Sequence, residues 1–201
     1  MPRRVRIGVK LHFKVTDRDG RVVREWEEEG HSFTQNFATL LFLMFAQVAE
    51  TLYDTAGSAV SVNGSSYGTA SLSASPSDTS YGIIFGSGTG SNSVTLYNLY
   101  APLTSSSFSY SSVSFPEAPT VSGSQVSFKV SRSMTNNSGS TVNVTEIGVI
   151  ARLGGFNMSY LSTGASVSAD NFLIIYDQPS SPISLENGQT LTVTYTITLN
   201  A

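Results

Sequence analysis

Histidines and carboxylates are the residues of this chain that could carry acid–base chemistry. The two histidines are His12, on the charged face of an expected strand, and His31, just before an expected helix. Neither is spaced with a serine and a carboxylate in a way that predicts a catalytic triad. The chain has no cysteine, which excludes thiol nucleophiles, disulfides and zinc–thiolate sites together.

Scattered carboxylates are the remaining candidates, because glycoside cleavage uses two carboxyl groups that flank the scissile bond. Turns and strand ends explain their positions better than a shared site does. These residues are Glu117, Glu146, Asp170, Asp177 and Glu186. We therefore expect no catalytic residue, no cofactor and no metal, and we expect that the protein is not an enzyme.

Two loops resemble ligand-binding motifs without meeting their requirements. Segment 86–91 is rich in glycine, but a dinucleotide loop needs a helix after it, and residues 92–99 alternate as a strand does. Segment 17–20 opens like a calcium loop but lacks the later ligands and the closing glutamate. We expect a flexible interstrand loop at the first and a turn at the second.

Composition favours a protein whose surface is covered by neighbours. Charged residues make up 12 % of the chain, about half of the usual 25 %. Hydroxyl and amide surfaces cost less to desolvate than lysine and glutamate surfaces. The net charge of −3 does not favour nucleic acid as the main partner. The longest apolar stretch, residues 37–46, is too short to span a membrane.

Charge is concentrated in residues 1–30, which carry eight basic and six acidic residues. Apolar and polar residues alternate strictly over residues 4–15, which predicts a strand with one buried face. After a turn, residues 21–29 return as its partner, with Val22 and Trp26 on one face. The sequence therefore predicts a charged β-hairpin with cross-strand ion pairs.

One helix is expected, from about residue 33 to residue 50. Ser32 and Gln35 have the spacing of a capping box, and apolar residues from Phe33 to Val48 recur on one side. This helix is too apolar to lie bare on a surface. We expect that it either plugs the core of its own chain or is partly buried by another copy.

The rest of the chain predicts a mainly-β fold, an antiparallel β-sandwich of jelly-roll or immunoglobulin-like type. Residues 57–80 read as a polar loop or a weak pair of edge strands. Seven expected strands follow, at 81–85, 94–99, 108–115, 125–132, 142–151, 172–176 and 191–199. We expect two units: residues 1–50 as a hairpin and helix that mediate assembly, and residues 51–201 as the sandwich domain.

Three stretches of the chain resemble virion structural proteins of tailed phages and of archaeal viruses. They are SYGIIFGSGTGS at 80–91 with YNLYAPL at 97–103, SRSMTNNSGSTVNVTEIGVIARL at 131–153, and FLIIYDQPSSPISLENGQTLTVTYTITL at 172–199. The expected helix start at residues 32–37 also fits. The resemblance implies a non-enzymatic, multimeric protein that lacks a secretion signal.

Two functions of different classes follow. The first is a self-assembling capsid, tail or decoration subunit of a virion, made in the host cytoplasm and partnered by its own copies and by other virion proteins. The second is an extracellular filament subunit that donates strand 4–15 to the next copy, or a receptor- or glycan-binding fibre protein.

Apolar residues of the hairpin and helix are the expected assembly interface. They are Val5, Ile7, Val9, Leu11, Phe13, Trp26, Phe37, Leu41, Met44 and Phe45. If they join the subunits, deletion of residues 1–30 should leave a folded sandwich that no longer assembles.

Overall fold

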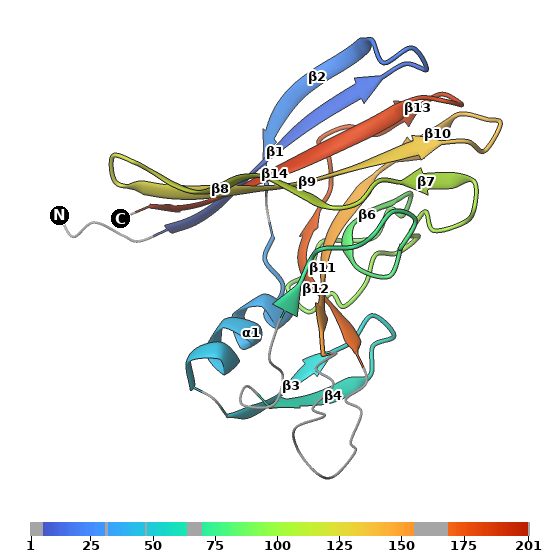
Figure 1. Cartoon of the computed structure of the whole chain (residues 1–201). Coiled ribbons are helices and arrows are strands. Elements are labelled where there is room, and N and C mark those ends of the chain that lie inside the picture. The colour runs from blue at the N-terminus through green and yellow to red at the C-terminus, as the bar shows by residue number, and fades with distance from the viewer. Residues whose placement is uncertain (1–5, 31, 47, 64–69, 155–168, 201) are drawn as a thin grey trace.

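The computed structural model describes residues 6–30, 32–46, 48–63, 70–154 and 169–200. Over these ranges the chain is mainly β, with antiparallel sheets and one α-helix (Figure 1). The expected mainly-β fold class is therefore confirmed.

The largest sheet has six strands in the order β2-β1-β14-β9-β7, with β8 also paired to β9 (Figure 1). Its strands are β1 (Arg6–Thr16), β2 (Val22–Glu29), β7 (Phe108–Tyr110), β8 (Ser114–Ser122), β9 (Gln125–Asn136) and β14 (Thr190–Asn200). Along β14, buried apolar residues alternate with half-buried threonines as far as Ile197. Leu199, the last apolar residue of the strand, is exposed. The alternation seen in the sequence thus gives this sheet one core face and one polar face.

Strand β1 lies inside this sheet and is paired on both sides. It pairs with β14 from Arg6↔Asn200 to Thr16↔Thr190, and with β2 on its other side. The hairpin therefore shares one sheet with the C-terminal strand, and the expected boundary at residue 50 does not separate the two. The local pattern of each strand predicts that it is a strand, but it does not predict that β1 and β14 pair with each other.

A second sheet of four strands supplies the other part of the core. Its order is β12-β11-β5, with β6 also paired to β11. These strands are β5 (Ala70–Ser71), β6 (Gly82–Gly86), β11 (Glu146–Leu153) and β12 (Asp170–Asp177). Strands β6, β11 and β12 are buried along most of their length. In Figure 1 they run below the long sheet and across its direction.

The helix α1 (Gln35–Ala46) covers one end of this core, where it packs on β12. It is shorter than expected at both ends, and β3 (Ala49–Tyr53) follows it and pairs with β4 (Ala59–Asn63). Leu40 and Leu43 are buried in the chain's own core, whereas Phe42 is exposed. The plug interpretation therefore accounts for the buried side of the helix.

Residues 94–99 do not form the strand that their alternation predicts. The Val94 carbonyl accepts a hydrogen bond from the Gln35 amide at 2.7 Å, and the Leu96 amide closes a turn on the Ser93 carbonyl at 3.1 Å. The Asn98 side chain accepts from the Leu99 amide at 2.9 Å. Local serine and asparagine contacts of this kind compete with strand pairing, and here they prevail.

Two other expected strands are each divided in the structure. The 108–115 segment becomes β7 and the start of β8, and the 142–151 segment becomes β10 (Val142–Val144) and most of β11. Strand β10 pairs with β13 (Ile183–Leu185) in a separate two-stranded sheet. The remaining expected strands are present with boundaries shifted by a few residues.

Candidate interaction surfaces

Three of the expected interface residues belong to the core of their own chain. Val9, Leu11 and Phe13 of β1 are all buried in the cluster that both sheets share. Their own chain buries these three side chains, so the prediction that they contact another copy does not fit this fold. The alternation correctly predicted a buried face, but it could not show that the same chain buries it.

The other expected interface residues are divided between partial burial and exposure. Phe37 packs on the core and stacks on Phe33, with 4.2 Å between the ring centroids. Leu41 is half-buried, and Ile7 is exposed. Val5 and the side chains of Met44 and Phe45 lie outside the part of the chain that the structure describes.

Trp26 is partly buried, and its ring contacts two side chains of its own chain. Phe13 stacks on one face at 4.9 Å between centroids, and the Arg24 guanidinium lies 4.6 Å from the ring centre. Its indole nitrogen donates to Glu28, which also accepts two hydrogen bonds from Ser180 at 2.8 Å. Arg24, Trp26, Glu28 and Ser180 line a depression of about 400 Å³.

Hydroxyl groups occupy the centre of the outer face of the long sheet. Three pairs link β14 to β9 across the sheet, each with 2.7–2.8 Å between oxygens. They are Thr194 with Ser131, Thr192 with Ser133, and Thr190 with Thr135. Cross-strand hydroxyl pairs of this kind add a few tenths of a kcal/mol each, roughly, to sheet stability.

Ion pairs flank this hydroxyl stripe on both sides. Lys10 binds Glu27 at 3.0 Å, and Lys129 binds Glu117 at 2.7 Å. These hydrogen bonds lower the pKa of both glutamates from its ordinary value. His12 lies 2.8 Å from Glu25 on the same face. The cross-strand pairs expected of the hairpin are present, and the charges on this face are locally balanced.

Glu146 is a fully buried carboxylate that holds the glycine-rich segment in place. It accepts hydrogen bonds from the amides of Gly88, Tyr100 and Ala101 at 2.7–2.9 Å. The Tyr176 hydroxyl donates to it at 3.2 Å, and burial together with this carboxylate raises the pKa of Tyr176. Both of its carboxylate oxygens therefore accept hydrogen bonds from its own chain, and these bonds fix the backbone at Gly88 and at residues 100–101. The flexible loop expected at 86–91 is pinned to β11 at Gly88.

The glycines of this segment are required by close packing. A β-carbon on Gly86 or Gly88 would collide with the Glu146 carboxylate, and one on Gly90 would collide with the Tyr100 ring. The sequence pattern that resembles a phosphate-binding loop is thus explained by the approach of one buried carboxylate and one tyrosine.

Gly88→Ala should destabilise the fold, because the new methyl group forces Glu146 away from its three amide donors. We expect a loss of about 2–3 kcal/mol in the free energy of unfolding, as for other overpacked sites. Gly8→Ala is the matched control, since nothing lies within 4 Å of its β-carbon. Urea unfolding of both variants measures the difference, and equal stability would show that Glu146 can move without cost.

Arg132 is a buried guanidinium that ties the long sheet to β6 and the segment before it. It donates to the carbonyls of Tyr81 and Ile83 at 3.0 and 3.1 Å. The other three acceptors are the carbonyls of Ser75, Asp78 and Ser111. Its charge lies 4.7 Å from the centre of the Tyr110 ring. Burial lowers the pKa of Arg132, but an arginine remains charged at neutral pH.

Buried tyrosines predict a loss of stability at alkaline pH. Burial raises the pKa of Tyr110 and Tyr195 above the ordinary value of 10.0, and nearby Asp177 raises that of Tyr195 further. Below pH 10 both states hold these protons, so stability is unaffected. Above it the unfolded chain ionises first, so stability falls as pH rises.

Tyrosinate absorbance and circular dichroism, followed together through an alkaline titration, test this expectation. Some of the nine tyrosines should ionise only as the fold is lost. Ionisation of all nine near pH 10 with the fold intact would contradict it.

Two turns that lie far apart in the sequence are joined through Asn136. Its amide nitrogen donates to the carbonyls of Ser140 and Leu185 at 2.8 and 2.9 Å. Its backbone carbonyl accepts from the Gly188 amide at 2.6 Å, and the Asn187 side chain accepts from the Gly139 amide at 2.9 Å. The NNSGS and NGQ stretches thus form one joint between β9 and β14.

Comparison with known proteins found no match to this chain among family models, curated proteins or solved structures. In the ranges that the structure describes, no helix has the length and hydropathy needed to cross a membrane. Within the same residues, no group of three or more histidine and acidic side chains is arranged to hold a metal ion.

Proposed function

We propose that this protein is a non-enzymatic structural subunit of a virus particle, of the capsid, tail or decoration type, and that it acts by packing against copies of itself. The observation that carries this proposal concerns the polar residues of the three stretches that resemble virion proteins. They bind loops and turns of their own chain. Glu146, Asn136 and Asn187 all hold loops or turns in place. Such residues make a rigid block, which is what an assembly of repeated subunits requires.

Three of the candidates for carboxylate chemistry lie in the virion-like stretches, and two of them, Glu146 and Asp177, are buried, whereas Glu186 is exposed. Glu146 is buried and accepts four hydrogen bonds from its own chain. Asp177 is buried next to Tyr195 in the core. Both positions favour a structural role over contact with a substrate.

A filament built by strand donation is less compatible with this fold. Strand β1 would have to leave eleven residue pairs with β14 and its pairing with β2 before it could join another copy. Its core residues would be exposed during that exchange. Packing of intact subunits avoids this cost, and so we place the virion proposal first.

Electron microscopy of the concentrated, purified protein tests the proposal. We expect closed shells, tubes, rings or sheets made of regular subunits. Long uniform fibrils would support strand donation instead. A protein that remains monomeric and binds a glycan array would support the fibre alternative. Terminase or portal genes beside the gene for this chain would support the virion setting, and a pilus cluster would count against it.

A further inference from the structure

We propose that two copies of this chain pack face to face through an apolar row at the free end of the long sheet. This inference rests on the proposed function and names one of the contacts that it needs. The row consists of Ile7, Leu199, Val126 and Val121, on four neighbouring strands. It gives the self-association a specific surface, which shares only Ile7 with the interface expected from the sequence.

Strand register places these four residues side by side. Ile7 is opposite Leu199, Leu199 is opposite Val126, and Val126 is opposite Val121. Paired residues of neighbouring strands project from the same face of a sheet. All four side chains are exposed, by 43 % for Ile7 and Leu199, 36 % for Val126 and 76 % for Val121. They form a continuous apolar strip across β1, β14, β9 and β8.

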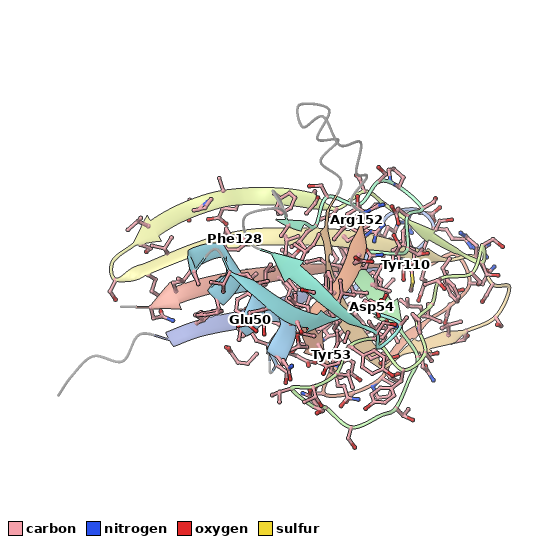
Figure 2. All side chains as sticks on the ribbon, turned by 90° about the horizontal axis from the view of Figure 1, so that it is seen from below. Glu50, Tyr53, Asp54, Tyr110, Phe128 and Arg152 are labelled. Atoms are coloured by element: carbon pink, nitrogen blue, oxygen red, sulfur yellow. The ribbon has the colours of Figure 1, made fainter. Side chains whose placement is uncertain are left out.

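The apolar row lies on the core-facing side of the long sheet, past the end of the elements that cover that side. The next row inward contains Val9 and Ile197, which are buried, and Phe128, which is partly buried. Figure 1 shows the β8–β9 hairpin and the adjoining ends of β1 and β14 projecting past the second sheet. Seen from below, Phe128 lies toward this projecting end and Tyr110 toward the other (Figure 2). The inner face is thus left uncovered at its end.

The size of the apolar row fits a modest interface. Its exposed side chains amount to on the order of 400 Å² of apolar surface, which is comparable to the largest patch on a typical monomer. A twofold contact between two such rows with their polar margins buries on the order of 1,000 Å² in total, the lower limit for a specific interface. We therefore expect a weak dimer in solution, which a particle would stabilise through further contacts.

A second copy of the chain is the occupant that this surface fits best. None of the four residues is charged, so a twofold axis that runs along the row, with each side chain against its counterpart, brings no like charges together. Strand addition at the neighbouring edge is opposed by Pro116 and Pro119 of β8 and by two register shifts in its pairing with β9. The contact is therefore made through side chains of the face and not through the backbone of the edge.

Val121→Asp tests the contact, because this side chain is mostly exposed and a carboxylate there should leave the monomer folded. Val94→Asp is the matched control, since Val94 is 63 % exposed and belongs to another segment. In sedimentation velocity over a concentration series, we expect the wild type and V94D to dimerise and V121D to require at least about tenfold higher concentration, or about 1.4 kcal/mol. A wild type that stays monomeric, or equal dimerisation of all three, overturns the proposal.

Cysteine cross-linking gives a second test that does not depend on a tolerated charge. Because the chain has no cysteine, Val121→Cys introduces a single thiol. We expect V121C to form a disulfide-linked dimer much faster than V94C under mild oxidation. Equal rates overturn the contact.

The two tests also separate this contact from the proposed function. Particles that assemble from V121D as from the wild type would leave the structural role standing and remove this interface. Selective cross-linking without any particle formation would support the dimer and count against the virion role. Retention of the wild-type dimer by V121D, together with capture of another virion protein at this row, would assign the surface to that protein.

Discussion

Deletion of residues 1–30 should prevent folding, and not only assembly. The deletion removes β1, which pairs with β14 over its whole length and contributes Val9, Leu11, Phe13 and Val15 to the core. It also removes Glu28, the acceptor of two hydrogen bonds from Ser180. Loss of β1 leaves the backbone groups on that side of β14 without partners and uncovers part of the core. Circular dichroism and thermal unfolding of the truncated chain measure the outcome.

A graded version of this prediction uses single substitutions on the hairpin. Phe13→Ala should lower the free energy of unfolding by about 3–5 kcal/mol, because it empties a fully buried site. Val23→Ser, at an exposed position of β2, should change it by less than about 0.5 kcal/mol. A truncated chain that unfolds cooperatively and is merely unable to assemble would restore the two-unit interpretation of the sequence.

Arg132→Met should lower the free energy of unfolding by about 3–5 kcal/mol, because leaving a buried acceptor without its donor costs roughly 1–3 kcal/mol and several acceptors are affected at once. Methionine fills a similar volume but donates nothing, so five carbonyl oxygens lose their common donor. The contact with the Tyr110 ring is also lost. Urea unfolding measures the change, and near-ultraviolet circular dichroism reports on the packing of Tyr110.

Two further variants separate geometry from charge at this site. Arg132→Lys keeps the charge, but an ammonium group has three donors where the guanidinium reaches five carbonyls, so most of the loss should remain. Lys129→Met, on the outer face of the same strand, removes only an exposed ion pair and should cost less than about 1 kcal/mol. If R132M lost no more stability than K129M, the five hydrogen bonds would not be the element that joins the sheets.

The interface between copies depends on contacts between distant segments, which the local sequence does not contain. Alternation along β1 predicts a surface for another copy, yet pairing with β14, nearly two hundred residues away, makes most of the apolar face of β1 part of the core. Conversely, Val121, Val126 and Leu199 were not expected at an interface, because each looks like an ordinary strand residue. The only signal that could have found them was the register between strands, which local sequence does not contain.

The glycine-rich segment and Arg132 show a similar limit. The sequence showed that segment 86–91 was not a dinucleotide loop, because no helix follows it, but gave no reason for its glycines. That reason is the carboxylate of Glu146, about sixty residues further along the chain. Arg132 looked like one polar residue of an alternating strand, although its position points it into the core.

The amino-acid sequence by itself determined the mainly-β class, the hairpin, the helix and most of the strands. These features follow from side-chain periodicity and turn residues, which act over a few neighbours. Only the tertiary structure decided that β1 is central, that Glu146 and Arg132 are buried anchors, and that the apolar row is uncovered. Each depends on which distant segments pair and on where the second layer ends, and those contacts form only when the whole chain folds.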